Sequence, residues 1–210
     1  MTRSWGGGGH RSDLRTAGGI LLAAGSVILM AIITAEALYP APYTTGGNEI
    51  SDLGGARPPE ALVFQPSATI FNVAMIVVGL AVIAAAVLAH RGLGRWVLTV
   101  PLGLLGIGAL GVGLFPGTTG TPHALAAMVT FVAGGLACVA GGVVTAGPFR
   151  WLSVALGSIS LLTLASYMTL GDGAPLAGLG VGGVERWVVY PIVLWIVGFG
   201  GYLSARAGVA

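Results

Sequence analysis

Six long apolar runs, separated by short polar segments, make up most of the chain. Each run has about 20 residues, which is the length of helix that crosses a hydrocarbon core of ~30 Å. The pattern therefore predicts an all-α integral membrane protein, with a single six-helix transmembrane domain over residues 17–206. The predicted spans are 17–39, 68–89, 94–115, 122–146, 149–170 and 186–205.

The composition supports a membrane protein and limits its chemistry. Hydrophobic residues make up 55% of the chain and charged residues only 8%, which leaves too little polar surface for a soluble globule. The single cysteine, Cys138, lies within the fourth apolar run, where we expect it to pack among small residues. One thiol excludes an internal disulfide and a cysteine-based metal site.

The basic residues predict how the bundle is oriented. All nine are arginines, and seven of them fall on the side of the N-terminus when successive runs alternate in direction. The positive-inside rule then predicts six helices in the cell membrane with both termini cytoplasmic. Residues 1–16, which include four consecutive glycines, are expected to form a flexible cytoplasmic N-terminus. The arginines are scattered along one rim, which argues against nucleic acid as a partner.

The acidic residues show the opposite distribution. Six of the seven fall on the predicted outer face or in the outer end of a helix: Glu36, Glu49, Asp52, Glu60, Asp172 and Glu185. The positive-inside rule does not predict this clustering, because it hardly weighs carboxylates. The clustering indicates either a functional outer face or acidic loops that only keep this surface hydrated.

The first outer loop, residues 40–67, is long for a compact membrane protein, and such loops are commonly functional or disordered. It carries signals of order. Pro58-Pro59-Glu60 places proline in a first helical turn with a glutamate close behind, and Pro66 would end such a helix. We therefore expect an ordered loop with a short interfacial helix, whose apolar residues 61–64 rest on the bilayer surface or cap the bundle.

Polar residues from four predicted helices lie at similar depth near the outer face. Glu36 lies one turn below the outer end of the first helix, Asn72 about 7 Å into the second, and His123 in the first turn of the fourth. Glu185-Arg186 begins the sixth. Faces turned inward would unite these groups in one outward-facing pocket under the loop, the default hypothesis for ionisable groups in a membrane. The alternative is that each is hydrated separately at the interface.

Three of these residues are candidate catalytic acids or bases: Glu36, Asp52 and His123. His123 follows Pro122 at a helix N-terminus, where the helix dipole disfavours the imidazolium, so we expect a neutral ring that can accept a proton. The alternative for His123 is a hydrogen bond to a loop carbonyl. The candidate binding residues are Glu49, Ser51, Glu60, Asn72, Glu185 and Arg186. The Arg186 guanidinium can neutralise a lipid phosphate or a neighbouring carboxylate.

We expect no metal site and no cofactor. His123 is the only histidine on the predicted outer face, and the chain has no His-x-x-x-His pair, which disfavours zinc. A hard ion such as Ca²⁺ or Mg²⁺ held by the outer carboxylates is the alternative. The chain also contains no Gly-x-Ser-x-Gly nucleophile motif and no phosphate-binding glycine loop.

The outer loop carries a resemblance to known families. Its segment Asn48-Glu49-Ile50-Ser51-Asp52-Leu53-Gly54, followed by Pro58-Pro59-Glu60, Phe64 and Phe71-Asn72, resembles the signature of the Frag/DRAM/Sfk membrane proteins. The chain is more similar to a prokaryotic membrane family of unknown function, domain family number 998. The elements that match it are Ile50 to Gly54, Phe115-Pro116, His123 and Glu185-Arg186-Trp187.

This resemblance implies a six-span bundle but carries over no activity. Some eukaryotic relatives are linked to remodelling of lipid anchors and others to autophagy, so the resemblance implies lipid handling.

Three functions from different classes remain open. The first is a lipid- or isoprenoid-handling protein, which includes a membrane-embedded enzyme that uses acid and base residues. The second is a small-solute binding or transport subunit, and the third is a non-catalytic membrane organiser or sensor. The expected partners are membrane lipids, a small hydrophobic or polar ligand, and a membrane protein or a second copy of the chain.

Overall fold

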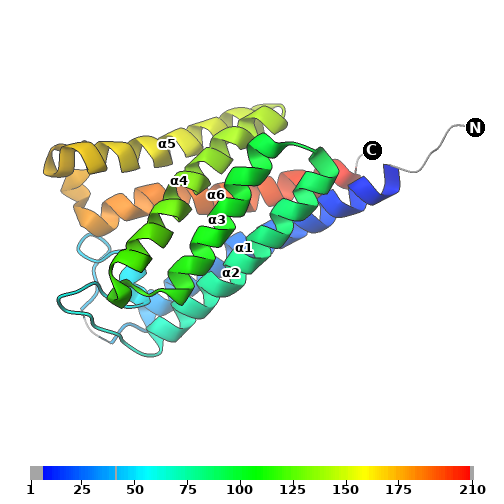
Figure 1. Cartoon of the computed structure of the whole chain (residues 1–210). Coiled ribbons are helices and arrows are strands. Elements are labelled where there is room, and N and C mark those ends of the chain that lie inside the picture. The colour runs from blue at the N-terminus through cyan, green and yellow to red at the C-terminus, as the bar shows by residue number, and fades with distance from the viewer. Residues whose placement is uncertain (1–6, 41, 209–210) are drawn as a thin grey trace, which may run out of the picture.

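A computed structural model describes residues 7–40 and 42–208, and over this part the chain is all-α (Figure 1). Six of its helices are long and apolar enough to cross a membrane, which confirms the predicted six-helix bundle. These helices are α1 (Gly7–Ala37), α2 (Ser67–Leu93), α3 (Trp96–Leu114), α4 (Thr121–Val144), α5 (Pro148–Leu170) and α6 (Gly180–Gly208). Short 3₁₀ helices lie at Ile50–Leu53, Gly117–Thr119, Gly171–Gly173 and Ala177–Leu179.

Each long helix packs against the next one in the chain, and α6 returns to pack against α1, so the bundle closes on itself. Both ends of the described chain lie at one end of the bundle, and the long α1–α2 connection lies at the other (Figure 1). We call the latter the loop end. The packing therefore brings together at the loop end the outer parts of helices that are distant in sequence.

Glycines let the helices approach closely. A Cβ atom on Gly79 of α2 would lie 2.8 Å from the carbonyl oxygen of Gly106 on α3, and one on Gly18 of α1 would lie 2.6 Å from that of Gly200 on α6. Contacts between small residues drive helix association in lipid, where the hydrophobic effect between helices is absent. The fully buried Trp195 and Phe199 of α6 stack on each other in the core.

The sequence predicts a flexible segment over residues 1–16, and the structure shows that α1 already begins at Gly7, so residues 7–16 are helical. Two contacts with the end of α2 explain the longer helix. The His10 Nδ1 atom lies 2.6 Å from the Arg91 carbonyl oxygen, and the buried Leu14 packs where a side chain on Gly92 would otherwise stand. Residues 1–6 lie outside the described residues.

The prediction of a short helix that begins at Pro58 is wrong. Residues 58–60 form a turn, Ala61 has a left-handed φ of 46°, and residues 61–64 have no regular secondary structure. A residue before proline is disfavoured from helical geometry, and this restriction acts on Arg57, Pro58 and Gln65, so the segment has no room for a helix. The short helix of this loop is Ile50–Leu53, within the family-like segment.

The sixth span begins earlier than predicted. Because α6 starts at Gly180, Glu185 and Arg186 lie in its second turn and not at its start. Their side chains therefore point at the loop from within the bundle.

Candidate functional site

Arg186 is the centre of a hydrogen-bond network that ties the outer loop to the bundle. Its Nη1 donates to the carbonyl oxygens of Thr45 (2.9 Å), Asn48 (2.9 Å) and Gly182 (3.0 Å). Its Nη2 donates to the Glu36 carboxylate (2.5 Å) and the Tyr43 hydroxyl (2.9 Å). Only 8% of Arg186 is exposed, so these acceptors replace water around a buried charge. Of the two roles predicted for Arg186, the network realises the neutralisation of a neighbouring carboxylate.

The segment Ile50–Gly54 is held by hydrogen bonds from α6 and α2, and α2 is in turn bonded to α1. The Ile50 N–H donates to the Glu185 carboxylate of α6. The Asn72 amide of α2 donates to the Gly54 carbonyl (3.0 Å), and Ser67 at the start of α2 donates to the Ala35 carbonyl of α1 (2.9 Å). Ser51 within this segment is buried. The resemblance to the family signature therefore falls on residues that fix the fold of the loop.

Two of the candidate catalytic residues have partners within this framework. Glu36 is paired with Arg186, and the Asp52 carboxylate accepts the backbone N–H of Glu49 (2.9 Å) at the start of the 3₁₀ helix. Both carboxylates stabilise the loop, which is a sufficient structural reason for their presence.

His123 has one hydrogen bond and one nitrogen without a partner. Its Nδ1 lies 2.8 Å from the Phe115 carbonyl oxygen, as in the alternative given above, so Nδ1 must carry the proton. A neutral ring then leaves Nε2 as an acceptor, and Nε2 is buried without a hydrogen-bond partner among the described residues. His123 is 1% exposed, so a ligand reaches Nε2 only if the surrounding side chains move.

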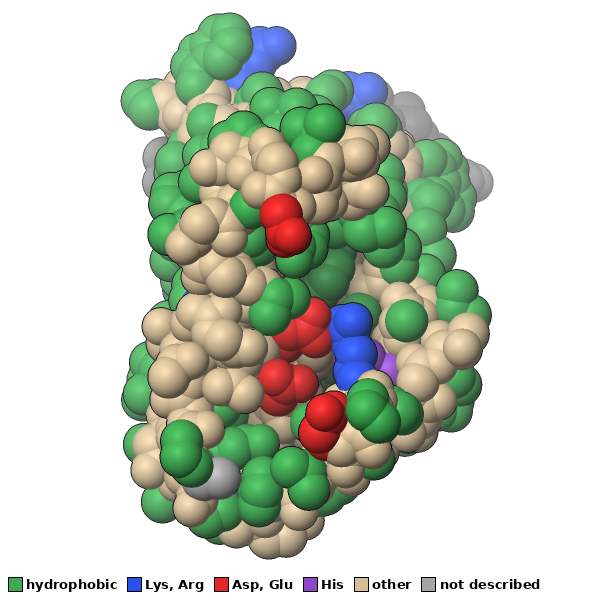
Figure 2. All heavy atoms as spheres, turned by 90° about the vertical axis from the view of Figure 1, so that its left-hand side faces the viewer, with side chains coloured by type: hydrophobic (Ala, Val, Ile, Leu, Met, Phe, Trp, Pro, Cys, Tyr) green, Lys and Arg blue, Asp and Glu red, His purple; other side chains and the backbone are tan. Residues whose placement is uncertain are grey.

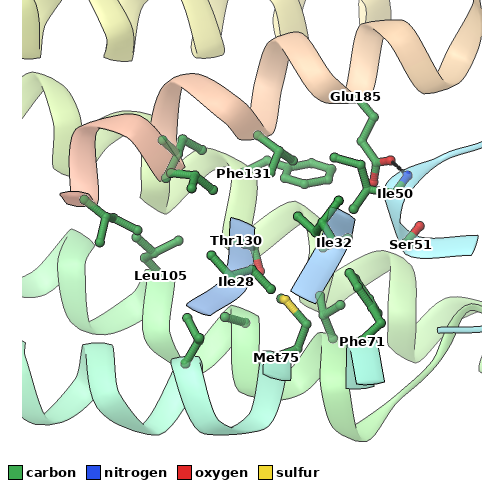
Figure 3. A pocket seen from close by; sticks show the side chains of 18 residues that line it. Ile28, Ile32, Ile50, Ser51, Phe71, Met75, Leu105, Thr130, Phe131 and Glu185 are labelled. Atoms are coloured by element: carbon green, nitrogen blue, oxygen red, sulfur yellow. Dashed lines mark hydrogen bonds between the residues drawn. The ribbon is translucent and has the colours of Figure 1, made fainter. Parts of the chain in front are cut away.

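An apolar inner cavity of about 80 Å³ lies in the middle of the loop-end half of the bundle (Figure 3). Its walls include Ile28, Ile32, Phe71, Met75, Leu105 and Phe131. Figure 3 shows the Glu185 carboxylate at one end of this cavity, where it accepts the Ile50 N–H beside Ser51. Glu185, Ile50 and Ser51 thus bound the cavity at its outer end, and its other walls are almost entirely apolar.

A second space, which we call the outer cleft, has a volume of about 280 Å³ and lies between α4, α5 and α6. One end is polar and is lined by Glu49, Arg57 and Glu185. The other walls are largely apolar and include Ala124, Met128, Phe131, Leu164, Tyr167, Met168 and Val188. Because Ala127, Phe131 and Glu185 also line the inner cavity, the two spaces share a wall.

A third hollow, the loop basin, lies on the loop itself and has a volume of about 450 Å³. It is lined by Glu49, Asp52, Arg57 and Glu60, with Tyr39 and Phe64 as aromatic walls. Figure 2 shows this end of the molecule, with acidic side chains gathered around a basic side chain beside a hollow. Glu49 and Arg57 line both the basin and the outer cleft, so the two openings meet at this pair.

The residues predicted to share one pocket line separate hollows or none of them, and a single outer pocket stays a prediction. Glu185, Glu49 and Arg57 meet in the outer cleft, and Asp52 and Glu60 join Glu49 in the loop basin. The walls of the inner cavity, outer cleft and loop basin do not include Glu36, Asn72 or His123.

Burial governs the electrostatics of the loop. The Glu49 carboxylate lies 2.8 Å from the Arg57 guanidinium, yet desolvation by burial raises the pKa of Glu49 above its usual value, against the lowering effect of Arg57. Desolvation likewise raises the pKa of Tyr43, which keeps its hydroxyl protonated and able to donate to the Glu49 carbonyl (2.9 Å). One guanidinium thus does not fully compensate the charge of Glu49.

Within residues 7–40 and 42–208, no group of three or more His, Cys, Asp or Glu side chains could hold a metal ion.

Comparison with known proteins gives a family but no activity. The model of the family described as "Protein of unknown function (DUF998)" matches residues 21–202, which include most of α1 and all of α2–α5. The chain belongs to the DUF998 family. No curated protein matches this DUF998 chain, and no solved structure matches it. The similarity to domain family number 998 is confirmed, whereas the likeness to the Frag/DRAM/Sfk proteins stays a prediction.

Two residues of the DUF998 site were missed by sequence reasoning. The candidate residues named from the sequence do not include Arg57, which pairs with Glu49, or Tyr43, which bridges Arg186 and Glu49. Arg57 is one of only two arginines on the acidic side of the chain, and this rarity is the signal that could have identified it.

Proposed function

We propose that this membrane protein handles lipids by binding one amphiphile, a lipid or an isoprenoid, in the outer cleft. The polar head of the amphiphile lies against Glu49, Arg57 and Glu185, and its hydrocarbon chain lies between α4, α5 and α6. The observation that carries the proposal is the division of this cleft into one charged end and otherwise largely apolar walls. Ligand sites combine a mostly apolar surface with a few polar groups that fix orientation in the same way.

The position of α5 supports entry of a long hydrocarbon chain into the outer cleft. Only 17% of the residues in its most apolar stretch are buried, compared with 50% for α4 and for α6. Helix α5 is fastened to α6 by hydrogen bonds from Trp195 to Ser153 (3.0 Å) and from Ser160 to the Val188 carbonyl (2.8 Å). Leu164 and Met168, which line the cleft, lie beyond these bonds toward the loop end. Because these bonds hold the half of α5 that is distant from the loop end, the half that lines the cleft can move outward at low cost in free energy.

We also propose that the loop end faces the outside of the cell membrane. Arg11, Arg15, Arg91, Arg95, Arg150 and Arg206 belong to the opposite ends of their helices or to the connections there. The positive-inside rule assigns this arginine-rich end, with both termini, to the cytoplasm. The amphiphile would then come from the outer leaflet.

A membrane-embedded enzyme that acts on the bound lipid is the second candidate. It is favoured by the presence of two carboxylates, Glu49 and Glu185, in one cleft, since a general acid and a general base are commonly a pair of carboxylates in different environments. Binding has the stronger support, because Glu36 and Asp52 have structural partners and His123 Nε2 is enclosed.

A photoactivatable oleyl alcohol tests the proposed site. We expect irradiation of the purified protein in a non-ionic detergent to label peptides of α4 and α5 that contain Met128 and Leu164, as mapped by mass spectrometry. Ala124→Trp, which places an indole in the cleft from an exposed position, should abolish this labelling. The matched control is Ala165→Trp, at an exposed α5 position outside the three cavities, and it should label as the wild type does.

Labelling spread evenly over all six helices, or unaffected by Ala124→Trp, would contradict the proposal.

The second candidate function, an enzyme that acts on the bound lipid, is tested with the protein in nanodiscs of dioleoylphosphatidylethanolamine. Lipid products that form with the wild type and not with Glu185→Gln would identify an enzyme, and unchanged lipid would favour a binding protein.

A further inference from the structure

The charges at the polar end of the outer cleft do not balance. Its lining contains two carboxylates, Glu49 and Glu185, and one guanidinium, Arg57. The adjoining loop basin adds the carboxylates of Asp52 and Glu60 and no further basic side chain. The polar end of the cleft therefore contains one more acidic side chain than basic side chains.

The one guanidinium in the cleft is already engaged. Arg57 Nη2 lies 2.8 Å from Glu49 Oε2, and the Arg57 side chain is 48% exposed, so it is partly screened by water. The pKa of Glu49 is nevertheless raised by burial, which means that Arg57 compensates this carboxylate incompletely.

Glu185 has no basic partner at all within the described residues. Neither of the ion pairs within 4.0 Å involves Glu185, and its hydrogen bond comes from the neutral backbone N–H of Ile50. Its neighbour in sequence, Arg186, is turned to Glu36 and to loop carbonyls. The cleft thus presents one carboxylate without a counter-charge next to apolar walls formed by Phe131 and Val188.

We infer that the outer cleft selects amphiphiles whose head carries an ammonium group, which lies against Glu185 and Glu49 while the hydrocarbon chain lies along α4 and α5. An ammonium supplies the missing positive charge and up to three hydrogen-bond donors to carboxylates that can only accept. A purely anionic head would meet like charges at low dielectric constant, where repulsion is strongest. This inference rests on the proposed function, because it names the class of ligand that the same cleft takes.

Probes with the same hydrocarbon chain separate the contribution of the head group to binding from that of the hydrocarbon chain. Oleylamine, oleyl alcohol and oleic acid share one chain and differ in head charge, and butylamine carries the amine without the long chain. We expect oleylamine to compete with the photoactivatable oleyl alcohol at about tenfold lower concentration than oleyl alcohol does, since a hydrogen bond to a charged group contributes ~1.5 kcal/mol or more. Oleic acid should compete worst, and butylamine should not compete at the concentrations that suffice for oleylamine.

Matched variants connect the preference to Glu185. Glu185→Gln keeps a side-chain oxygen for the Ile50 N–H but removes the charge, so the preference for oleylamine over oleyl alcohol should fall about tenfold. Glu60→Gln removes the same charge from an exposed position outside the cleft and should leave the preference unchanged. Fluorescence-detected thermal unfolding verifies that both variants are folded.

The outcomes distinguish this inference from the proposed function. If the probes bind in the cleft without regard to head charge, the ammonium inference fails and the amphiphile site stands. If butylamine competes as well as oleylamine, the cleft takes a small soluble amine and the inference of an amphiphile is overturned. If no probe labels the cleft, the proposed function itself fails. An equal loss of preference in Glu60→Gln and Glu185→Gln would assign the effect to the surface potential and would also overturn the inference.

Discussion

Glu185 and Arg186 are adjacent in sequence and opposite in environment. Arg186 has five acceptors from α1, α6 and the loop, whereas Glu185 has a single backbone donor and opens onto the inner cavity and the outer cleft. Successive residues of an α-helix point in directions about 100° apart, so neighbours meet different surroundings. One turn of α6 thus supplies a charge that builds the loop and a charge that remains available to a ligand.

The largest expected effect is the loss of the structural member of this pair. Arg186→Met leaves the Glu36 carboxylate and two loop carbonyls without their donor, and removal of one partner from a buried ion pair costs about 3 kcal/mol or more. We expect a clear fall in the thermal unfolding midpoint in detergent. A midpoint equal to that of the wild type would contradict the structural role of Arg186.

Glu36→Gln should have a smaller effect on stability. The amide oxygen can still accept the Arg186 hydrogen bond, but the charge assistance is lost, which corresponds to about 1–2 kcal/mol. The midpoint in the same unfolding assay should lie between those of Arg186→Met and the wild type. A loss as large as that of Arg186→Met would assign the network to the ion pair alone and not to the loop carbonyls.

Comparison of these residues shows how far the sequence predicts the molecule. The six spans follow from the apolar runs, because only helices that satisfy their own backbone hydrogen bonds cross lipid in this way. The ends of the helices cannot be predicted from the apolar runs, since the start of α1 depends on contacts of His10 and Leu14 with the distant end of α2.

The sequence likewise predicts only part of the candidate site. The sequence identifies Glu36, Glu185 and Arg186 as polar groups at the outer end, but Glu36 and Arg186 are 150 residues apart, and nothing in their local pattern specifies that they pair. Nor does the pattern specify that Glu185 lacks a counter-charge, because this depends on which face of α6 meets the loop.

Glu49 makes stability depend on pH in a defined direction. Because burial raises its pKa above 4.5 in the folded state, the folded protein holds this proton more tightly than the unfolded chain does. The contribution of Glu49 to stability is therefore greatest below pH 4.5 and falls as pH rises through the raised pKa. Glu49→Gln should lose this part of the pH dependence, measured as the difference in unfolding midpoint between variant and wild type across a pH series. A difference that does not change with pH would contradict the burial of a charged Glu49.

The smallest effect is expected at the exposed end of the cleft. Arg57→Gln breaks the pair with Glu49, but the Arg57 side chain is 48% exposed and screened by water, so the loss should be about 1 kcal/mol or less and the unfolding midpoint should move little. The oleylamine preference should rise, because a competing positive charge has been removed from the cleft. A fall in that preference would show that Arg57 attracts the ligand head instead.

The most direct measurement is an experimental structure of the protein with oleylamine bound. The account predicts density in the outer cleft, with the nitrogen within hydrogen-bond distance of the Glu185 carboxylate, the chain beside Phe131 and Met128, and Arg186 still bonded to Glu36. Density for the head at Arg186 with the Glu36 pair broken, or an outer cleft filled by its own side chains, would contradict the division of roles between these two neighbouring residues.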